Sequence, residues 1–258
     1  GKEKLLILEA GKTIFQNFTL GMKKEWKEDK TPLTATDIAV NEMVIRKVKE
    51  QFPGFPLIGE EASMVGGGES EYAWVLDPID GTRNFANGIP FFAVSIALIN
   101  EKEPIVGVVY NPATNSLFYA EKGKGAYLND KRIHVSKDTA DKALVTAASG
   151  RKTMDLKIRR NIMRDLPERV VSSVRDLGCT ALDLSYLARG STEADLKFGL
   201  AVYDMAAGIL LVKEAGGLVT NTEGGEWKLN DSSFIASNGV FHDLLVEEVK
   251  KQKEKLGI

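Results

Sequence analysis

The stretch WVLDPIDGTRNF, residues 74–85, is the most informative part of the chain. Its apolar residues predict a strand that ends in two aspartates, Asp77 and Asp80, which a proline-containing turn can aim into one small volume. Two like charges so close repel unless a cation joins them, and hard carboxylate oxygens suit Mg²⁺ better than zinc. Gly81 and Thr82 follow directly and could offer backbone amides and a hydroxyl to a phosphate. The stretch therefore predicts adjacent metal and phosphate sites, although Asp, Pro and Gly are also common in an ordinary turn.

Three further acidic segments favour the site over the turn. LIGEE places Glu60 and Glu61 just past an apolar strand and a glycine, where a strand can deliver a side chain to a site. TATD and VYDMAAG place Asp37 and Asp204 at the expected starts of two helices. A carboxylate in that position is also an ordinary helix cap, so each of these two segments alone has a purely structural explanation. Together, however, the segments supply carboxylates from four separated parts of the chain.

Hydrophobic periodicity predicts a chain of mixed helices and strands. Helices are expected over residues 3–20 and from 36 or 37 to 53, followed by strands at 56–60, 72–77, 92–99, 104–110 and 116–120. The remainder is expected to contain strands at 144–148, 170–174, 194–198 and 234–237, helices at 154–166, 182–188 and 204–215, and a charged C-terminal helix. This order indicates an α/β (α+β) layered sandwich. Because no linker rich in Pro, Gly or Ser interrupts it, we expect a single domain over residues 1–258, with halves of about 1–138 and 139–258.

The composition excludes several classes of protein. A chain of 258 residues with 43% hydrophobic content can bury a real core. Its 36 acidic and 34 basic residues give a net charge of −2, so we expect no nucleic-acid partner. The apolar run near the start is too short to span a membrane, and the single cysteine, Cys179, cannot form an intramolecular disulfide. We therefore expect a cytoplasmic protein with no membrane partner.

Four motifs, TATD, GEE, DPIDGTRNF and YDMAAG, occur in the order and approximate spacing of the inositol monophosphatase family. The chain resembles that family from Pro32 to about Gly217, and DPIDGT is highly specific. The resemblance implies the layered sandwich that the family shares with fructose-1,6-bisphosphatase, and a homodimer. It also implies a Mg²⁺-dependent phosphatase that acts on a small phosphorylated metabolite.

The resemblance assigns metal ligands residue by residue. It implies a first Mg²⁺ held by Glu60, Asp77 and the backbone carbonyl of Ile79. A second Mg²⁺ is held by Asp77, Asp80 and Asp204, so that Asp77 bridges the two. A third metal near Glu60 is left open, and Mn²⁺ is a possible substitute.

The resemblance also implies how phosphate and water are held. Gly81 and Thr82 match the phosphate-binding positions, and Asp37 matches the acid that pairs with the threonine hydroxyl. We hypothesise that a metal-activated water, oriented by Glu60 and by the Thr82–Asp37 pair, attacks phosphorus in line. No covalent phosphoenzyme is required.

On the substrate side, Thr180 and Ala181 match the family's substrate-side helix, and Asp80 and Asp204 also face the substrate. Lys197 stands where animal inositol monophosphatases have a glutamate that holds inositol hydroxyls. A lysine there disfavours simple transfer of inositol specificity. It could meet a second anionic group, as in a sugar bisphosphate, or it could be a solvated lysine on an edge strand.

We expect the substrate to be inositol-1-phosphate and/or fructose-1,6-bisphosphate. Histidinol phosphate and a nucleotide 3′-phosphate are alternatives within the same superfamily. A catalytically silent regulator that binds a phosphorylated ligand is the alternative from another class, and a metal-dependent glycosyl or nucleotidyl transferase is a third. The acidic side chains at the expected ligand positions favour the enzyme, because a silent descendant would be free to lose them.

Overall fold

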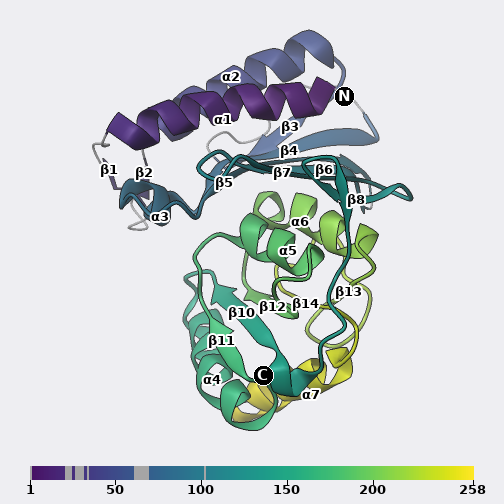
Figure 1. Cartoon of the computed structure of the whole chain (residues 1–258). Helices are drawn as coiled ribbons and strands as arrows, with labels where there is room; N and C mark the ends of the chain where they lie inside the picture. The colour runs from purple at the N-terminus through teal and green to yellow at the C-terminus, as the bar shows by residue number, and fades with distance from the viewer. Residues whose placement is uncertain (1, 21–24, 27–31, 34, 61–69, 102) are drawn as a thin grey trace.

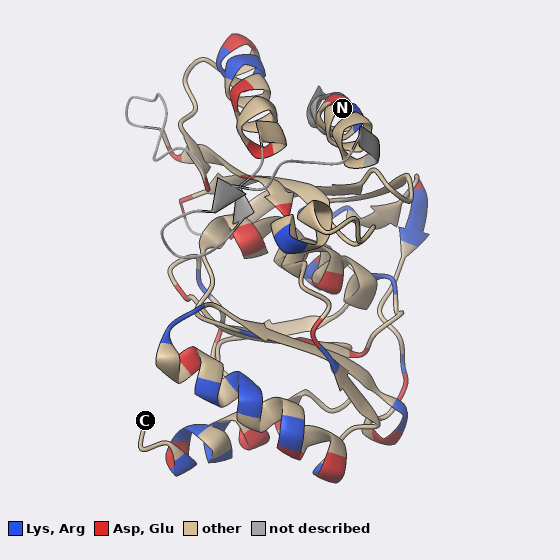
Figure 2. Cartoon of the chain, turned by 90° about the vertical axis from the view of Figure 1, so that its left-hand side faces the viewer, with Lys and Arg blue, Asp and Glu red and all other residues tan. Residues whose placement is uncertain are grey.

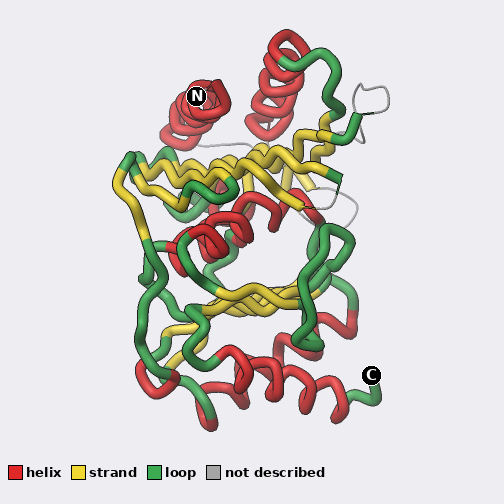
Figure 3. Tube along the Cα trace, turned by 90° about the vertical axis from the view of Figure 1, so that its right-hand side faces the viewer, coloured by secondary structure: helices red, strands yellow, loops and turns green. Residues whose placement is uncertain are grey.

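The computed structural model describes residues 2–20, 25–26, 32–33, 35–60, 70–101 and 103–258, in which helices and sheets are stacked in alternate layers (Figure 1). One pair of helices covers the outer face of a seven-stranded sheet, and a second pair separates this sheet from a five-stranded one (Figure 3). A third pair covers the far face of the five-stranded sheet. These pairs are, in that order, α1 (Lys2–Leu20) with α2 (Ala35–Gln51), α5 (Thr180–Ala188) with α6 (Val202–Glu214), and α4 (Thr153–Arg169) with α7 (His242–Lys255). The predicted layered sandwich is confirmed.

The seven-stranded sheet follows the chain in the order β3-β4-β5-β6-β7-β8-β9. Its strands are β3 (Leu57–Gly59), β4 (Tyr72–Asp80), β5 (Ala93–Asn100), β6 (Glu103–Asn111), β7 (Ser116–Glu121), β8 (Gly125–Leu128) and β9 (Lys131–Ile133). β3 and β4 are parallel, and the other neighbours are antiparallel. Because helices lie on both faces, β4 is buried continuously from Trp74 to Ile79.

The five-stranded sheet has the order β11-β10-β12-β14-β13. Its strands are β10 (Leu144–Ser149), β11 (Ser173–Arg175), β12 (Ala194–Phe198), β13 (Leu218–Thr220) and β14 (Phe234–Ser237). β10 pairs in parallel with β11 and β12, whereas β14 is antiparallel to both of its neighbours. β12 is therefore an internal strand of this sheet. A short hairpin of β1 (Glu25–Trp26) and β2 (Pro32–Leu33) lies apart from both sheets.

The middle helices are largely buried because a sheet lies on each side of them, and α6 is apolar all round from Met205 to Val212. The run Ala206, Ala207 and Gly208 lets α6 approach β6 closely. At Gly107 of β6, a Cβ atom would lie 2.8 Å from the carbonyl oxygen of Ala207. The small residues after Asp204 thus permit close packing of α6 against the seven-stranded sheet.

Several predicted elements differ in extent from those of the structure. The strand expected to end at Asp77 continues to Asp80, and α4 runs to Arg169 although it contains Pro167. β8, β9 and β13 were not predicted, because strands this short carry too little hydrophobic alternation to be recognised. Glu61 lies outside the described residues.

The outer helices carry both signs of charge. Figure 2 shows Lys and Arg interspersed with Asp and Glu along α4 and α7. Within the described ranges, no helix combines the length and the uninterrupted apolar sequence that crossing a bilayer requires.

Candidate active site

β4 delivers two carboxylates through an irregularity in its pairing with β5. Asp77 pairs with Ser95 and Asp80 pairs with Ala93, so one extra residue of β4 is accommodated between them. Side chains three positions apart on a regular strand point to opposite faces of the sheet, and a bulge of one residue brings them to the same side. Pro78 suits the bulge because it has no N–H to donate to a strand ladder.

The neighbouring strand β3 brings Glu60 to the same edge. The N–H of Glu60 donates a 3.3 Å hydrogen bond to the carbonyl of Leu76, which places Glu60 beside Asp77 across the parallel pair. Asp77 is 2% exposed, and its Oδ1 accepts a 3.0 Å hydrogen bond from the N–H of Ile79. The local turn thus holds the Asp77 carboxylate in place.

Two helices supply the remaining carboxylates. Asp204 lies in the first turn of α6, where its Oδ2 accepts a 2.9 Å hydrogen bond from the N–H of Ala201. The capping explanation for Asp204 is therefore correct, and it is compatible with a site because a carboxylate has a second oxygen. Asp37 lies in the first turn of α2 and is fully buried.

These carboxylates disfavour one another's ionisation. Burial, followed by the charges of Glu60, Asp80, Asp204 and Asp37, holds the pKa of Asp77 well above its usual range. Burial raises the pKa of Asp80 to about 6. Burial and the nearby charge of Asp80 raise the pKa of Asp204 to about 8. Such crowding is what a bound divalent cation would relieve.

The carboxylates lie near enough to affect one another's pKa values but do not form a finished metal-ligand cage. In the part of the chain that the structure describes, no three His, Cys, Asp or Glu side chains are already grouped as a metal-ligand set. Their chemistry nevertheless fits Mg²⁺, which prefers oxygen ligands and usually keeps several of its own waters.

Gly81 turns the chain from β4 into the short helix α3 (Thr82–Ala86). Its φ of +85° lies in the left-handed region that favours glycine. There is also little room for a side chain, since a Cβ atom would lie 3.0 Å from the Phe91 carbonyl oxygen and 3.1 Å from Cβ of Cys179. The turn therefore brings the end of β4 close to the start of α5.

Thr82 closes this turn through its hydroxyl. Its Oγ1 donates a 2.9 Å hydrogen bond to the carbonyl oxygen of Ile79. A carbonyl oxygen has two lone pairs, so Ile79 can accept this bond and still face a metal. The expected pairing of the Thr82 hydroxyl with Asp37 stays a prediction.

A cavity of about 560 Å³ opens above these residues. Segments from both sheets line it, including the ends of β3, β4 and β10 and the starts of α5 and α6. The lining residues are Glu60, Asp80, Gly81, Thr82, Arg83, Asn84, Ser149, Gly150, Arg151, Gly178, Thr180, Gly199, Leu200, Ala201, Tyr203 and Asp204. Asp77, Ile79 and Asp37 are buried behind this lining.

The sequence pattern of the inositol monophosphatase family matches residues 2–254. The chain belongs to this family. A Mesorhizobium japonicum protein named inositol-1-monophosphatase is 35% identical over 95% of this chain and 93% of its own length. An Aquifex aeolicus protein named fructose-1,6-bisphosphatase/inositol-1-monophosphatase is 36% identical, with 97% and 95% covered. The crystal structure of the extragenic suppressor protein suhB from Bartonella henselae has a TM-score of 0.89 and 33% identity, with 96% of each chain covered.

Lys197 of this inositol monophosphatase family member does not contact the cavity. It is 0% exposed on the internal strand β12, and its Nζ lies 2.7 Å from Asp183 Oδ2 and 2.6 Å from Asp195 Oδ1. Both sequence-based interpretations, a substrate contact and a solvated lysine on an edge strand, are therefore wrong in this structure. They failed because the sequence does not show which strands flank β12 or which helix covers it.

Thr180 lines the cavity as expected, whereas Ala181 is not among the lining residues. The Ala181 side chain is fully buried in the apolar core. Its backbone N–H donates a 2.5 Å hydrogen bond to Asp80 Oδ2. Ala181 thus positions a carboxylate and does not present its side chain to a substrate.

The sequence analysis missed several lining residues of this family member, among them Asn84, Arg151 and Tyr203. Asn84 donates 2.8 Å hydrogen bonds from Nδ2 to the carbonyls of Phe91 and Leu177, which joins α3 to the segment before α5. Its place inside DGTRNF could have signalled it. Arg151 follows the end of β10, the same kind of position that identified Glu60, whereas nothing in the sequence distinguished Tyr203.

Proposed function

We propose that this protein hydrolyses the phosphate monoester of a small polyol in a Mg²⁺-dependent reaction. The observation that supports this most directly is the convergence of carboxylates from β3, β4 and α6 on one cavity beside the Gly81–Thr82 turn. The names of its relatives, which include inositol-1-monophosphatase and fructose-1,6-bisphosphatase, point to the same reaction class.

Glu60, Asp77, Asp80, Asp204 and the carbonyl oxygen of Ile79 would hold two or three Mg²⁺ ions, or Mn²⁺ in their place. When bound, such ions neutralise phosphoryl oxygens, acidify water and stabilise a leaving alkoxide. The mutual repulsion of the carboxylates supports this assignment, because their charges raise one another's pKa values and a bound cation would relieve that repulsion.

The chain's own groups would position the reactants. The Gly81 and Thr82 amides would hold the phosphate, and Glu60 and the Thr82 hydroxyl would orient the water for in-line attack. Asp37 would act on that water through Thr82. Asp80 and Thr180 would fix the leaving group's side of the cavity, where the Ala181 N–H already holds the Asp80 carboxylate.

The substrate that we favour is inositol-1-phosphate and/or fructose-1,6-bisphosphate. A cavity of about 560 Å³ is large enough for either. Histidinol phosphate and a nucleotide 3′-phosphate are the competing substrates. We also propose that the protein is cytoplasmic and forms a homodimer. Light scattering of the purified protein would measure its mass in solution and so test the dimer.

Phosphate release across these substrates, with Mg²⁺ and with EDTA, tests the proposed function. We expect release with Mg²⁺, loss of release with EDTA, and selective turnover of inositol-1-phosphate or fructose-1,6-bisphosphate. Release that is unchanged by EDTA would contradict the metal assignment. No release from any substrate would favour a silent phospho-ligand-binding regulator instead.

The stability of the metal-free protein should depend on pH in a definite direction. The folded-state pKa values of Asp80 and Asp204 are raised from 3.8 to about 6 and about 8, so the folded state binds more protons than the unfolded state over that range. The contribution of these groups to the free energy of unfolding must then fall as pH rises from about 4 to about 8. Added Mg²⁺ should raise the unfolding midpoint more at about pH 8 than at about pH 5, because the ligands must be deprotonated to bind.

Thermal unfolding in EDTA and in Mg²⁺ measures this directly. Other groups also titrate in this window, so the matched control is Asp204→Asn, which removes one of the raised groups. In EDTA, the thermal unfolding midpoint of the variant should exceed that of the wild type by an amount that grows as pH rises. A difference that does not change with pH would contradict the assigned shift.

A further inference from the structure

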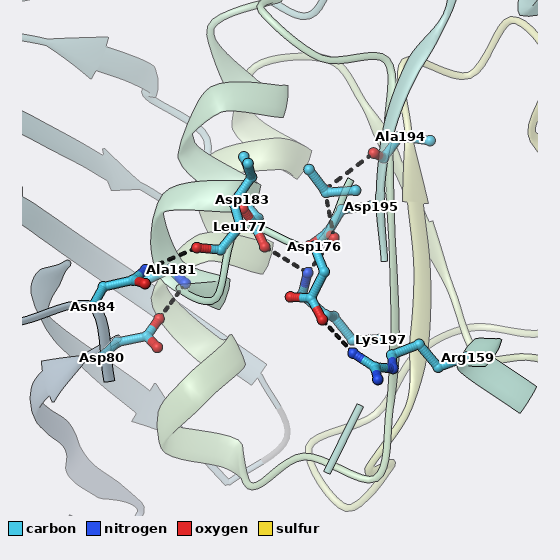
Figure 4. A network of polar contacts seen from close by, with 11 residues as sticks. Asp80, Asn84, Arg159, Asp176, Leu177, Ala181, Asp183, Ala194, Asp195 and Lys197 are labelled. Atoms are coloured by element: carbon cyan, nitrogen blue, oxygen red, sulfur yellow. Dashed lines mark hydrogen bonds and ion pairs between the residues drawn. The ribbon is translucent and has the colours of Figure 1, made fainter. Parts of the chain in front are cut away.

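Lys197 is the centre of a buried ionic unit beneath the candidate active site (Figure 4). Asp195 and Lys197 lie two positions apart on β12 and therefore face the same side of the sheet, toward α5. Asp183 reaches the ammonium from the first turns of α5. All three side chains are 0% exposed, and Thr146 of β10 donates a 2.7 Å hydrogen bond to Asp195 Oδ1.

This unit is incompletely satisfied. Two carboxylates share one ammonium, and the remaining oxygens, Asp183 Oδ1 and Asp195 Oδ2, have no hydrogen-bond partner among the described residues. A buried ionic group of this kind usually contributes no more to stability than apolar side chains of the same volume, and often less. Stability therefore does not by itself account for the unit.

The unit is joined to the active site through α5. Asp183 is two residues from Ala181, whose N–H binds Asp80 Oδ2 at 2.5 Å. The segment before α5 is fixed by Asn84 through the Leu177 carbonyl, and by an ion pair between Asp176 and Arg159 of α4. Figure 4 shows these contacts as separate pairs, which are linked through the backbone of α5 and of the segment before it.

We propose that Lys197 and Asp183 are positioning residues that anchor the first turn of α5, so that the Ala181 N–H holds Asp80 in the orientation needed to bind the metal. Asp195, which lies on β12, serves to retain Lys197. This proposal rests on the proposed function for the identity of the metal site.

The test compares Asp183→Leu with Asp195→Leu in the full chain. Each substitution removes one negative charge from the same lysine and leaves it one carboxylate partner, but only Asp183 lies on α5. We expect Asp183→Leu to weaken Mn²⁺ binding, measured by calorimetry without substrate, by about 10- to 100-fold. Asp195→Leu should bind Mn²⁺ nearly as wild type does.

A second pair, Asp183→Asn and Asp195→Asn, repeats the comparison with side chains of unchanged shape. The losses of Mn²⁺ affinity at the two positions can then still be compared if a leucine variant does not fold. Asp183→Asn keeps an oxygen for Lys197 and should recover part of the affinity. Equal losses at both positions would show a general charge effect and overturn the proposal. Wild-type affinity in both Asp183 variants would overturn it as well.

Failure of this proposal can be told apart from failure of the proposed function. If the wild type binds Mn²⁺ but releases no phosphate from any substrate, the proposed reaction is wrong and the comparison of variants still judges the positioning role. If the wild type does not bind Mn²⁺, the metal site is refuted, and the positioning proposal is refuted with it. If the wild type is active and the Asp183 variants match it in Mn²⁺ affinity and KM, only the positioning role is refuted.

Discussion

Replacing Asp77 with asparagine is expected to lower kcat by about 10³-fold or more while leaving the fold intact. Asp77 is buried close to the other carboxylates, and in the proposed site it would be a ligand for the bound metal. Loss of that ligand removes several kcal/mol of charge stabilisation, and each 1.36 kcal/mol is about tenfold in rate. Phosphate release with saturating Mg²⁺ measures the effect.

The same substitution should stabilise the metal-free protein. Because the folded state disfavours the ionised Asp77, a neutral asparagine removes a repulsive buried charge. The matched control is Asp165→Asn, a buried aspartate between α4 and α7 whose Oδ2 accepts a 3.0 Å hydrogen bond from Gln252 and lies 3.3 Å from the Lys255 ammonium. For Asp165→Asn we expect a lower free energy of unfolding and an unchanged kcat. Activity of Asp77→Asn close to wild type would refute the assignment of Asp77 as a ligand.

Replacing Gly81 with alanine is expected to lower kcat/KM by about 100-fold. The substitution forces a left-handed conformation on a residue with a side chain, at a cost of about 1–2 kcal/mol. It also places a methyl group 3.0 Å from the Phe91 carbonyl oxygen and 3.1 Å from Cβ of Cys179, so the turn and the residues just before α5 must shift to relieve these contacts. A displacement of about 1 Å in a positioned group can reduce a rate about 100-fold.

Gly88→Ala separates the two effects of this substitution. Gly88 has a φ of +73°, so it carries the same kind of backbone strain, but nothing lies within 4 Å of its added Cβ. We expect both variants to lose similar stability in denaturant unfolding, and only Gly81→Ala to lose activity. Equal activity in the two variants would show that contact between the Gly81 turn and α5 is not needed for catalysis.

The acidic residues of the candidate site could be read from the sequence because each occupies a locally recognisable position. Glu60 follows a strand, Asp204 begins a helix, and Asp77 and Asp80 flank a proline. In the structure Glu60, Asp80 and Asp204 line one cavity and Asp77 is buried close enough to feel their charges, while their role as metal ligands stays a prediction. The hydrophobic pattern likewise predicted most helices and the longer strands, since burial of one face imposes its period on the sequence.

What the sequence determined about this protein is thus the chemistry of the site, the family and the layered class of fold. Only the tertiary structure decided that a one-residue bulge turns Asp77 and Asp80 to the same side, and that Lys197 is buried. Local residues do not specify either outcome. The bulge depends on the register with β5, and the burial of Lys197 depends on β10 and β14 flanking β12 and on α5 covering it, through contacts between segments far apart in the chain.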